Sequence, residues 1–253
     1  MKYNSIKWAV AKFGLEIRRL NTHEFPVEAL PAEIEIMKSV RPFTMTSSQR
    51  IWGAMRSVRY LVENDLPGAI VECGVWRGGT IMAMLAELKL LGDESRDIYL
   101  FDTFSGMTDP TDWDIDARNG MSAAQLMNET ASESKGGDNV WAVSSLEQTR
   151  RNVLSIGYPE EKIHFVEGDV RVTLQSQVPQ EIALLRLDTD WYDSTAKELD
   201  VLYPNIVSGG VCIIDDYGHY AGTRKAVDEY LQERQIRPLI ISLDYTARIW
   251  AKA

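Results

Sequence analysis

The sequence predicts an α/β fold with a mostly parallel, Rossmann-like sheet. Between residues 69 and 233, short apolar runs that suit buried strands alternate with segments whose apolar residues recur at helical spacing. This alternation is typical of strand–helix–strand units joined by right-handed crossovers. Aspartates or glycine-rich turns follow several of the strand-like runs. Because open α/β sheets bind ligands at the carboxyl ends of their strands, we expect a binding site at that edge.

Five short apolar runs are the expected parallel strands, at residues 69–73, 98–101, 163–166, 182–187 and 210–214. Two later runs, at 239–243 and 247–250, are close enough in the chain to form a closing hairpin. The hairpin would add an antiparallel strand at one side of the sheet.

Helices are expected between the strands, where apolar residues have helical spacing, at 80–91, 145–156, 194–203 and 222–233. A further helix over 47–64 begins in a Ser/Thr cluster and ends before the turn Leu66-Pro67-Gly68. Together these helices would cover both faces of the sheet, as its buried strands require.

The N-terminal part of the chain is less regular. Residues 6–20 suit an amphipathic helix, and Pro26, Pro31 and Pro42 are expected to break the segment that follows. We therefore divide the chain into an N-terminal helical segment and lid, residues 1–65, and a ligand-binding domain, residues 66–253. Within that domain, residues 106–143 are long for a connection and rich in Asp, Gly and Ser, which is typical of a functional loop over an acceptor site.

Composition excludes several classes of function. The net charge of −10 argues against a nucleic-acid-binding surface and gives no attraction to anionic membranes. No run approaches the ~20 apolar residues of a membrane span, and no signal-peptide pattern opens the chain. The only cysteines, Cys73 and Cys212, lie in strand-like runs and are expected to be buried free thiols, with a disulfide as the alternative. We expect a cytoplasmic protein.

Four aspartates follow two of the expected strands. Asp188 and Asp190 come after the run 182–187, and Asp215 and Asp216 end the run 210–214. If the two strands are neighbours, the four carboxylates meet and repel one another unless a cation lies among them. Oxygen ligands alone favour a hard ion such as Mg²⁺. Alternatively, Asp190 caps the following helix, as Asp193 is also placed to do.

Asp188 and Asp190 are two residues apart. If the strand continues through both, their side chains share a face, so that one could hold the ion while the other points at the substrate.

Three other strand ends have features of a nucleoside site. Gly74 lies in a glycine-rich strand–helix turn whose spacing is not that of a dinucleotide-binding motif, which argues against NAD. Asp102, after the second strand, could accept hydrogen bonds from ribose hydroxyls. Gly168 and Asp169, after the third, could read an adenine amino group. Each could singly be a turn residue, but three in this order favour a cofactor site.

The sequence resembles the macrocin O-methyltransferase family. The resemblance rests on the segments 71–79 (Val-Glu-Cys-Gly-Val-Trp-Arg-Gly-Gly), 188–190 (Asp-Thr-Asp) and 214–217 (Ile-Asp-Asp-Tyr), and extends over about residues 41–250. It implies a class I methyltransferase fold and a Mg²⁺-dependent enzyme. Such an enzyme would move a methyl group from S-adenosylmethionine to a deoxysugar hydroxyl on a macrolide or related natural product.

The resemblance also implies roles for particular residues. The metal ligands would be Asp188, Asp215 and Asp216, and the general base Asp190. The expected cofactor-binding residues are Glu72, Gly74, Asp102, Thr103, Gly168, Asp169 and Met45. Met45 lies in the segment 41–46, which by resemblance could fold over the cofactor as part of a lid, although its composition is equally consistent with a plain linker. The expected partner is a small-molecule glycoside, and the chain is expected to form a homo-oligomer.

The chemistry is consistent with these roles, since a sugar hydroxyl is a poor nucleophile whose pKa falls on coordination to Mg²⁺. A nearby carboxylate can then take its proton. His219 is a second candidate for the base or a substrate contact, or a loop histidine with a hydrogen-bonding role. Two other functions remain open: methylation of a catechol-like or other diol acceptor, and nucleotide binding without catalysis.

Overall fold

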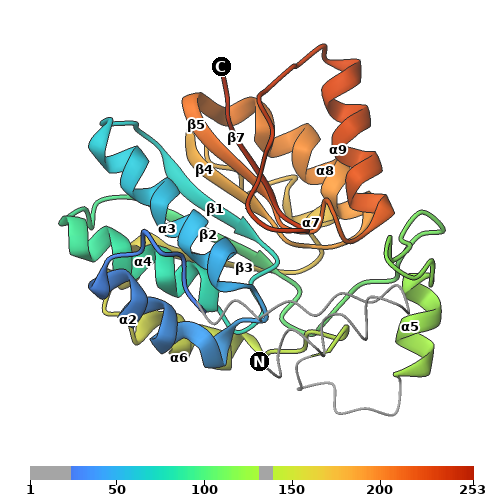
Figure 1. Cartoon of the computed structure of the whole chain (residues 1–253), viewed down its shortest axis with the longest axis horizontal. Coiled ribbons are helices and arrows are strands. Elements are labelled where there is room, and N and C mark those ends of the chain that lie inside the picture. Colours follow the sequence, from blue (N-terminus) through green and yellow to red (C-terminus); the bar gives the residue numbers. More distant parts are fainter. Residues whose placement is uncertain (1–23, 131–138) are drawn as a thin grey trace, which may run out of the picture.

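The chain is built around one twisted sheet of seven strands (Figure 1). A computed structural model describes residues 24–130 and 139–253; the helix expected at 6–20 lies outside them. The strand order is β3-β2-β1-β4-β5-β7-β6, in which the first five are parallel and the C-terminal two antiparallel. This confirms the predicted fold class. The strands are β1 (Ala69–Cys73), β2 (Ile98–Asp102), β3 (Ile163–Glu167), β4 (Ile182–Leu187), β5 (Ile206–Ile214), β6 (Ile241–Ser242) and β7 (Arg248–Ala251).

The strand order reverses at β1. The chain runs from β1 outward through β2 to β3, then returns to place β4 on the other side of β1 and β5 beyond it. In the register, Cys73 of β1 lies beside Leu187 of β4, which lies beside Ile214 of β5. The residues that follow these three strands therefore emerge together, at the crevice where doubly wound sheets bind ligands.

Helices cover both faces of the sheet. Side chains of α2 (Pro31–Val40), α3 (Ser48–Glu63), α4 (Gly79–Leu91) and α6 (Leu146–Leu154) share one hydrophobic cluster with alternate residues of the strands. The opposite face packs on α7 (Val170–Thr173), α8 (Tyr192–Leu202) and α9 (Ala221–Glu233). Helix α5 (Ala123–Glu129) lies apart from both layers (Figure 1). Short 3₁₀ turns occur at Arg41–Phe43, Glu160–Lys162 and Tyr203–Asn205.

Three α-helices, α2, α5 and the single-turn α7, were not anticipated. Pro31 was expected to break the segment, but it occupies the first turn of α2, where a backbone N–H has no partner within the helix and its absence removes no helical hydrogen bond. Glu33 then completes that start by accepting a hydrogen bond from the backbone N–H of Leu30 at 2.8 Å. Helix α5 lies within the segment 106–143 that was expected to be a loop, and it starts at Ser122, whose hydroxyl accepts the N–H of Gln125.

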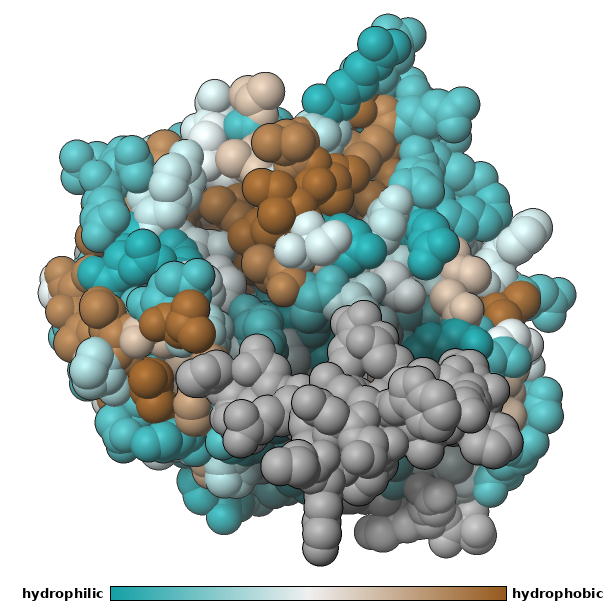
Figure 2. All heavy atoms as spheres, viewed as in Figure 1, coloured by the Kyte–Doolittle hydropathy of each residue, from teal (hydrophilic) through white to brown (hydrophobic). Residues whose placement is uncertain are grey.

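The surface is mixed, and apolar residues gather over the C-terminal hairpin (Figure 2). Leu239 and Ile241 there are 80% and 53% exposed. Among the helices of the described residues, none combines the length and hydropathy needed to cross a membrane. Cys73 and Cys212 are free thiols buried on β1 and β5.

Candidate active site

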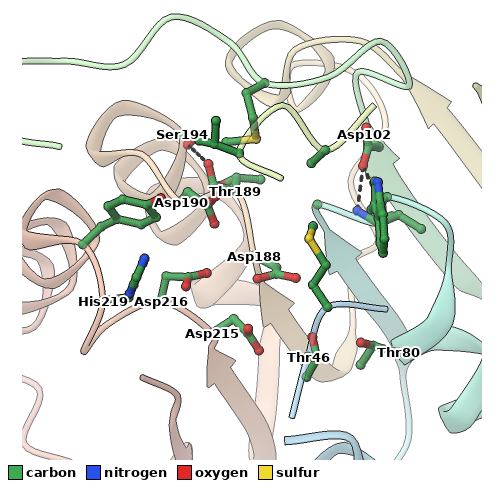
Figure 3. A pocket seen from close by; sticks show the side chains of 18 of the residues that line it. Thr46, Thr80, Asp102, Asp188, Thr189, Asp190, Ser194, Asp215, Asp216 and His219 are labelled. Carbon is green, nitrogen blue, oxygen red and sulfur yellow. Dashed lines mark hydrogen bonds between the residues drawn. The ribbon is translucent and has the colours of Figure 1, made fainter. Parts of the chain in front are cut away.

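A cavity of about 530 Å³ opens at the carboxyl edge of the sheet. Its size suits a small organic ligand, and its walls combine apolar groups with convergent carboxylates (Figure 3). Nearly all of the predicted site residues line it: Met45, Gly74, Asp102, Thr103, Gly168, Asp169, Asp188, Asp190, Asp215 and Asp216. Glu72 is not among the lining residues. The sheet therefore brings together side chains that are up to 171 positions apart in the chain.

Asp102 organises one end of the cavity. Its carboxylate accepts backbone N–H groups from Val75 at 2.7 Å, Trp76 at 2.9 Å and Phe104 at 2.7 Å. These bonds tie the turn after β1 to the end of β2. Oδ2 accepts two of these N–H groups, whereas Oδ1 accepts one and otherwise has only the Thr103 hydroxyl at 3.5 Å, so Oδ1 keeps acceptor capacity for a ligand hydroxyl. Burial raises the pKa of Asp102, against the effect of these hydrogen bonds.

Gly74 is required by the close approach of two strand ends. Its φ is +81°, and a Cβ there would lie 2.0 Å from the carbonyl oxygen of Asp188. Gly79 is crowded in the same way, because a Cβ would lie 2.6 Å from the carbonyl oxygen of Phe43. The glycines of this turn therefore let both the end of β4 and the segment 43–46 approach the cavity.

At the third strand end, Asp169 begins α7. Its side chain accepts the backbone N–H of Arg171 at 2.9 Å and pairs with the guanidinium of that residue at 2.5 Å. Hydrogen bonding to Arg171 lowers the pKa of Asp169. Gly168 beside it has φ +136°. Both residues line the cavity, so the positions proposed to read an adenine are at its wall.

Arg186 is the cation at the centre of the site, and sequence reasoning missed it. It is 2% exposed on β4, and it donates to Glu72 Oε1 at 2.6 Å and to Asp215 Oδ1 at 2.7 Å. It also pairs with Asp188 Oδ2 at 2.8 Å. The available signal was an arginine inside an apolar strand run, since a buried charge needs partners of opposite sign.

Glu72 therefore lies behind Arg186, 1% exposed, and its contact with a cofactor stays a prediction. Its second oxygen, Oε2, has no hydrogen-bond partner among the described residues. Burial raises the pKa of Glu72 to about 7, although Arg186 opposes that shift.

Arg50, on α3, is a second cation that the sequence did not reveal. Its guanidinium pairs with Asp215 Oδ2 and, at 3.1 Å, with Asp244 in the turn between β6 and β7. Asp215 is thereby held on both oxygens. Although burial opposes it, Arg186 and Arg50 lower the pKa of Asp215, which is ionised.

The four aspartates converge as predicted (Figure 3). Carboxylate oxygens of Asp188, Asp215 and Asp216 lie within 4.8 Å of one another. Burial, followed by the neighbouring charges, raises the pKa values of Asp188 and Asp216 well above the ordinary range. Burial and then Asp188 raise the pKa of Asp190 to about 7. These carboxylates share too little positive charge for all of them to ionise easily.

Asp190 reaches the cavity by a different route from the one expected. Strand β4 ends at Leu187, and Asp190 has a left-handed backbone with φ +65°, so Asp188 and Asp190 do not share a strand face. The turn nevertheless directs both side chains into the cavity (Figure 3). Asp190 does not cap α8 either, because the N-cap residue is Trp191.

The remaining wall of the cavity carries His219, Tyr220, Tyr245 and Arg118. The hydroxyl of Tyr245 lies 3.3 Å from Nδ1 of His219. Burial, followed by the charge of Arg118, lowers the pKa of His219, so that the ring is neutral near pH 7. This wall offers aromatic faces and neutral hydrogen-bonding groups next to the aspartates.

The residues present fit a divalent cation. Asp188, Asp215 and Asp216 offer only carboxylate oxygens, the ligands that Mg²⁺ prefers. Five carboxylates, those of Glu72 and the four aspartates, face the guanidinium groups of Arg50 and Arg186. A bound cation would relieve the repulsion that raises the pKa values of Asp188 and Asp216.

Comparison with known proteins connects this site to one family. Residues 37–252 match the macrocin O-methyltransferase family. Demethyldecarbamoylnovobiocin O-methyltransferase of Streptomyces niveus is 32% identical over 209 residues, covering 83% of this chain and 75% of the relative. The 8-demethyl-8-(2,3-dimethoxy-alpha-L-rhamnosyl)-tetracenomycin-C 4'-O-methyltransferase of Streptomyces olivaceus is 33% identical over 207 residues, covering 82% and 74%.

Solved structures agree with this assignment. The O-methyltransferase NovP superposes with a TM-score of 0.72 at 31% identity, over 83% of this chain and 82% of that chain. CalS11, a calicheamicin methyltransferase, has a TM-score of 0.59 at 18% identity over 94% and 98% of the two chains. At that identity, the second likeness shows a shared fold.

Proposed function

Because the chain belongs to the macrocin O-methyltransferase family, and is thus an O-methyltransferase, we propose that its acceptor is a sugar hydroxyl on a glycosylated natural product. The relatives at 30–33% identity, which include a mycinamicin III 3''-O-methyltransferase of Micromonospora griseorubida, support this acceptor class by the substrates in their names. S-adenosylmethionine is the methyl donor implied by membership of the family.

The observation on which the proposal rests is the convergence of Asp188, Asp190, Asp215 and Asp216 beside the wall that carries His219. Methyl transfer to an alcohol needs an oriented oxygen and a group to take its proton. This end of the cavity offers both functions next to each other. The opposite end, with Asp102 and Asp169, is where we place the nucleoside of the donor.

Asp188, Asp215 and Asp216 would hold Mg²⁺. When bound, the ion would lower the pKa of an acceptor hydroxyl and orient its oxygen. Asp190 then takes the hydroxyl proton on its carboxylate, for which its raised pKa of about 7 is well matched. Arg186 and Arg50 keep Asp215 ionised and fixed. His219, neutral and hydrogen-bonded to Tyr245, orients the acceptor from the other side.

The test is calorimetric titration of the full chain with S-adenosylhomocysteine, followed by Mg²⁺ in the same cell. Asp216→Asn is the informative variant, because Asp216 forms no ion pair with an arginine among the described residues, so the substitution leaves the Arg186 network intact. We expect unchanged nucleoside binding and loss of the Mg²⁺ event. Asp193→Asn, which alters a half-exposed aspartate of α8 whose ion-pair partner among the described residues is Arg171, is the matched control and should keep both events.

Three results would contradict parts of the proposal. Failure of the unaltered protein to bind the nucleoside would remove the methyltransferase assignment of this cavity. Nucleoside binding without a Mg²⁺ event would remove the metal. A panel of the glycosides for which the relatives are named, incubated with labelled S-adenosylmethionine, tests the acceptor class; transfer to a catechol but to no glycoside would replace it.

A further inference from the structure

A buried glutamate lies behind the site and has no part in the chemistry described so far. Glu198, on α8, is 0% exposed. Its Oε2 accepts a hydrogen bond from the hydroxyl of Thr189 at 3.1 Å. Its Oε1 has no nitrogen or oxygen partner among the described residues, and the Cys73 thiol lies beside the carboxyl group.

The position is costly for a carboxyl group. In the described part of the chain, no lysine, arginine or histidine pairs with Glu198, whereas buried acids elsewhere do, such as Glu72 with Arg186 and Glu87 with Arg59. Burial accordingly raises the pKa of Glu198 well above its ordinary value. A leucine, like the neighbouring Leu199 and Leu202, would fill this place more favourably.

Thr189 is the residue that the buried Glu198 carboxyl group holds by a hydrogen bond. It lies between Asp188 and Asp190 and lines the cavity (Figure 3). The backbone of its turn is held by the bond from the N–H of Trp191 to the carbonyl of Thr189, at 2.7 Å, and by the hydroxyl of Thr223 on the carbonyl of Asp190. The left-handed backbone of Asp190 is unfavourable for a residue with a side chain and persists only where its surroundings hold it.

We propose that Glu198 is a positioning residue, which holds the Thr189 side chain and thereby fixes the turn that aims Asp188 and Asp190 into the cavity. This role rests on the proposed function, since it matters only if those aspartates bind the metal and take the proton. Groups that orient metal ligands in this way commonly change metal affinity by 10–100-fold when they are removed.

The experiment compares Glu198→Gln, Glu198→Ala, Thr189→Val and the double variant Thr189→Val/Glu198→Ala in the full chain. Each is loaded with S-adenosylhomocysteine and titrated with Mg²⁺ by calorimetry. The order of the Thr189 methyl group is measured by NMR in the first two variants and in the unaltered protein. Glu87→Ala is the matched control, because Glu87 is equally buried but lies on α4 and pairs with Arg59 away from the cavity.

We expect Glu198→Ala to lower Mg²⁺ affinity about tenfold while leaving nucleoside affinity unchanged, and to disorder the Thr189 methyl group. Glu198→Gln, which keeps an acceptor oxygen in a neutral group, should restore both. Thr189→Val should match Glu198→Ala, and the double variant should lose no more, because the two side chains act as one unit. The Glu87→Ala control should keep its Mg²⁺ affinity even if it is less stable.

The proposal is overturned if Glu198→Ala binds Mg²⁺ as the unaltered protein does, if Glu198→Gln is as impaired as Glu198→Ala, or if the losses of the single variants add. Failure of the proposed function has a different signature, in which the unaltered protein binds no Mg²⁺. In that case the NMR order of the Thr189 methyl group still tests the role of Glu198, independently of the metal. Retained order in Glu198→Ala would refute the positioning role.

Discussion

Replacing Arg186 with methionine should strongly destabilise the protein. The guanidinium is within 2.8 Å of three carboxylates, those of Glu72, Asp188 and Asp215. Arg186 and two of its partners, Glu72 and Asp215, are at most 2% exposed. Methionine retains most of the volume but leaves the carboxylates without their shared cation. Because breaking a buried pair from one side leaves uncompensated charge, we expect the free energy of unfolding to fall by about 3–5 kcal/mol.

The loss should depend on pH in a defined direction. With Arg186 in place, the pKa of Glu72 is already about 7, above its ordinary value of 4.5. A carboxyl group whose pKa is raised in the folded state binds more protons folded than unfolded, so its contribution to stability falls as pH rises between those two values. Without Arg186 the carboxylates must either stay protonated or remain unpaired, so the destabilisation should be larger at pH 8 than at pH 5.5.

Urea unfolding followed by circular dichroism at pH 5.5 and pH 8 measures both effects, and near pH 7 the melting temperature should fall by about 10 °C. Arg151→Met is the control, since Arg151 is 70% exposed and pairs with Glu147, which is 90% exposed; its unfolding free energy should change by less than about 1 kcal/mol. A loss below about 1 kcal/mol for Arg186→Met at pH 8 would refute the reasoning that these carboxylates depend on one buried cation.

Two further predictions concern catalysis and the turn after β1. Asp190→Asn should slow methyl transfer by about 10²-fold or more with unchanged affinity for S-adenosylhomocysteine. In the unaltered enzyme the rate should fall below pH 7, because Asp190, with a pKa of about 7, must be ionised to accept a proton; a pH-independent rate, or normal turnover in the variant, would exclude it as the base. Gly74→Ala should destabilise the protein far more than Gly92→Ala in thermal unfolding. Both glycines have positive φ, and a left-handed backbone costs about 1–2 kcal/mol at each, but only at Gly74 would the Cβ meet a backbone oxygen. Equal losses would show that the contact with Asp188 is easily relieved.

The order of strands and helices was predictable because it depends on local pattern. The strands of a parallel sheet are buried on both faces, so they stand out as short apolar runs, and β1 to β5 lie where those runs are. The prediction that Pro31 breaks the N-terminal segment was wrong for a local reason as well. Pro31 is compatible with a helix only at its start, and whether the chain turns helical after it depends on packing of Met37 and Val40 into the core.

The candidate site was predictable to the extent that it depends on strand ends. Asp102 is the last residue of β2, and Asp169, Asp188 and Asp215 each follow a strand, so the parallel register carries all of them to one edge. Arg50 and Glu198 were not predictable in this way, because each lies on a helix at a position fixed by tertiary packing. Their side chains reach the site from α3 and α8, at distances that no spacing in the sequence encodes.

The sheet, its carboxylate-rich edge and the family can be recognised in the sequence alone, since they follow from periodicity and from short segments of adjacent residues. The tertiary structure decided how the charges are balanced. It placed Arg186 among Glu72, Asp188 and Asp215, gave Asp190 a left-handed backbone in place of a continued strand, and left Glu198 buried against Thr189. The physical reason is that electrostatic energy depends on distance and burial, which are set only when separate segments of the chain pack together.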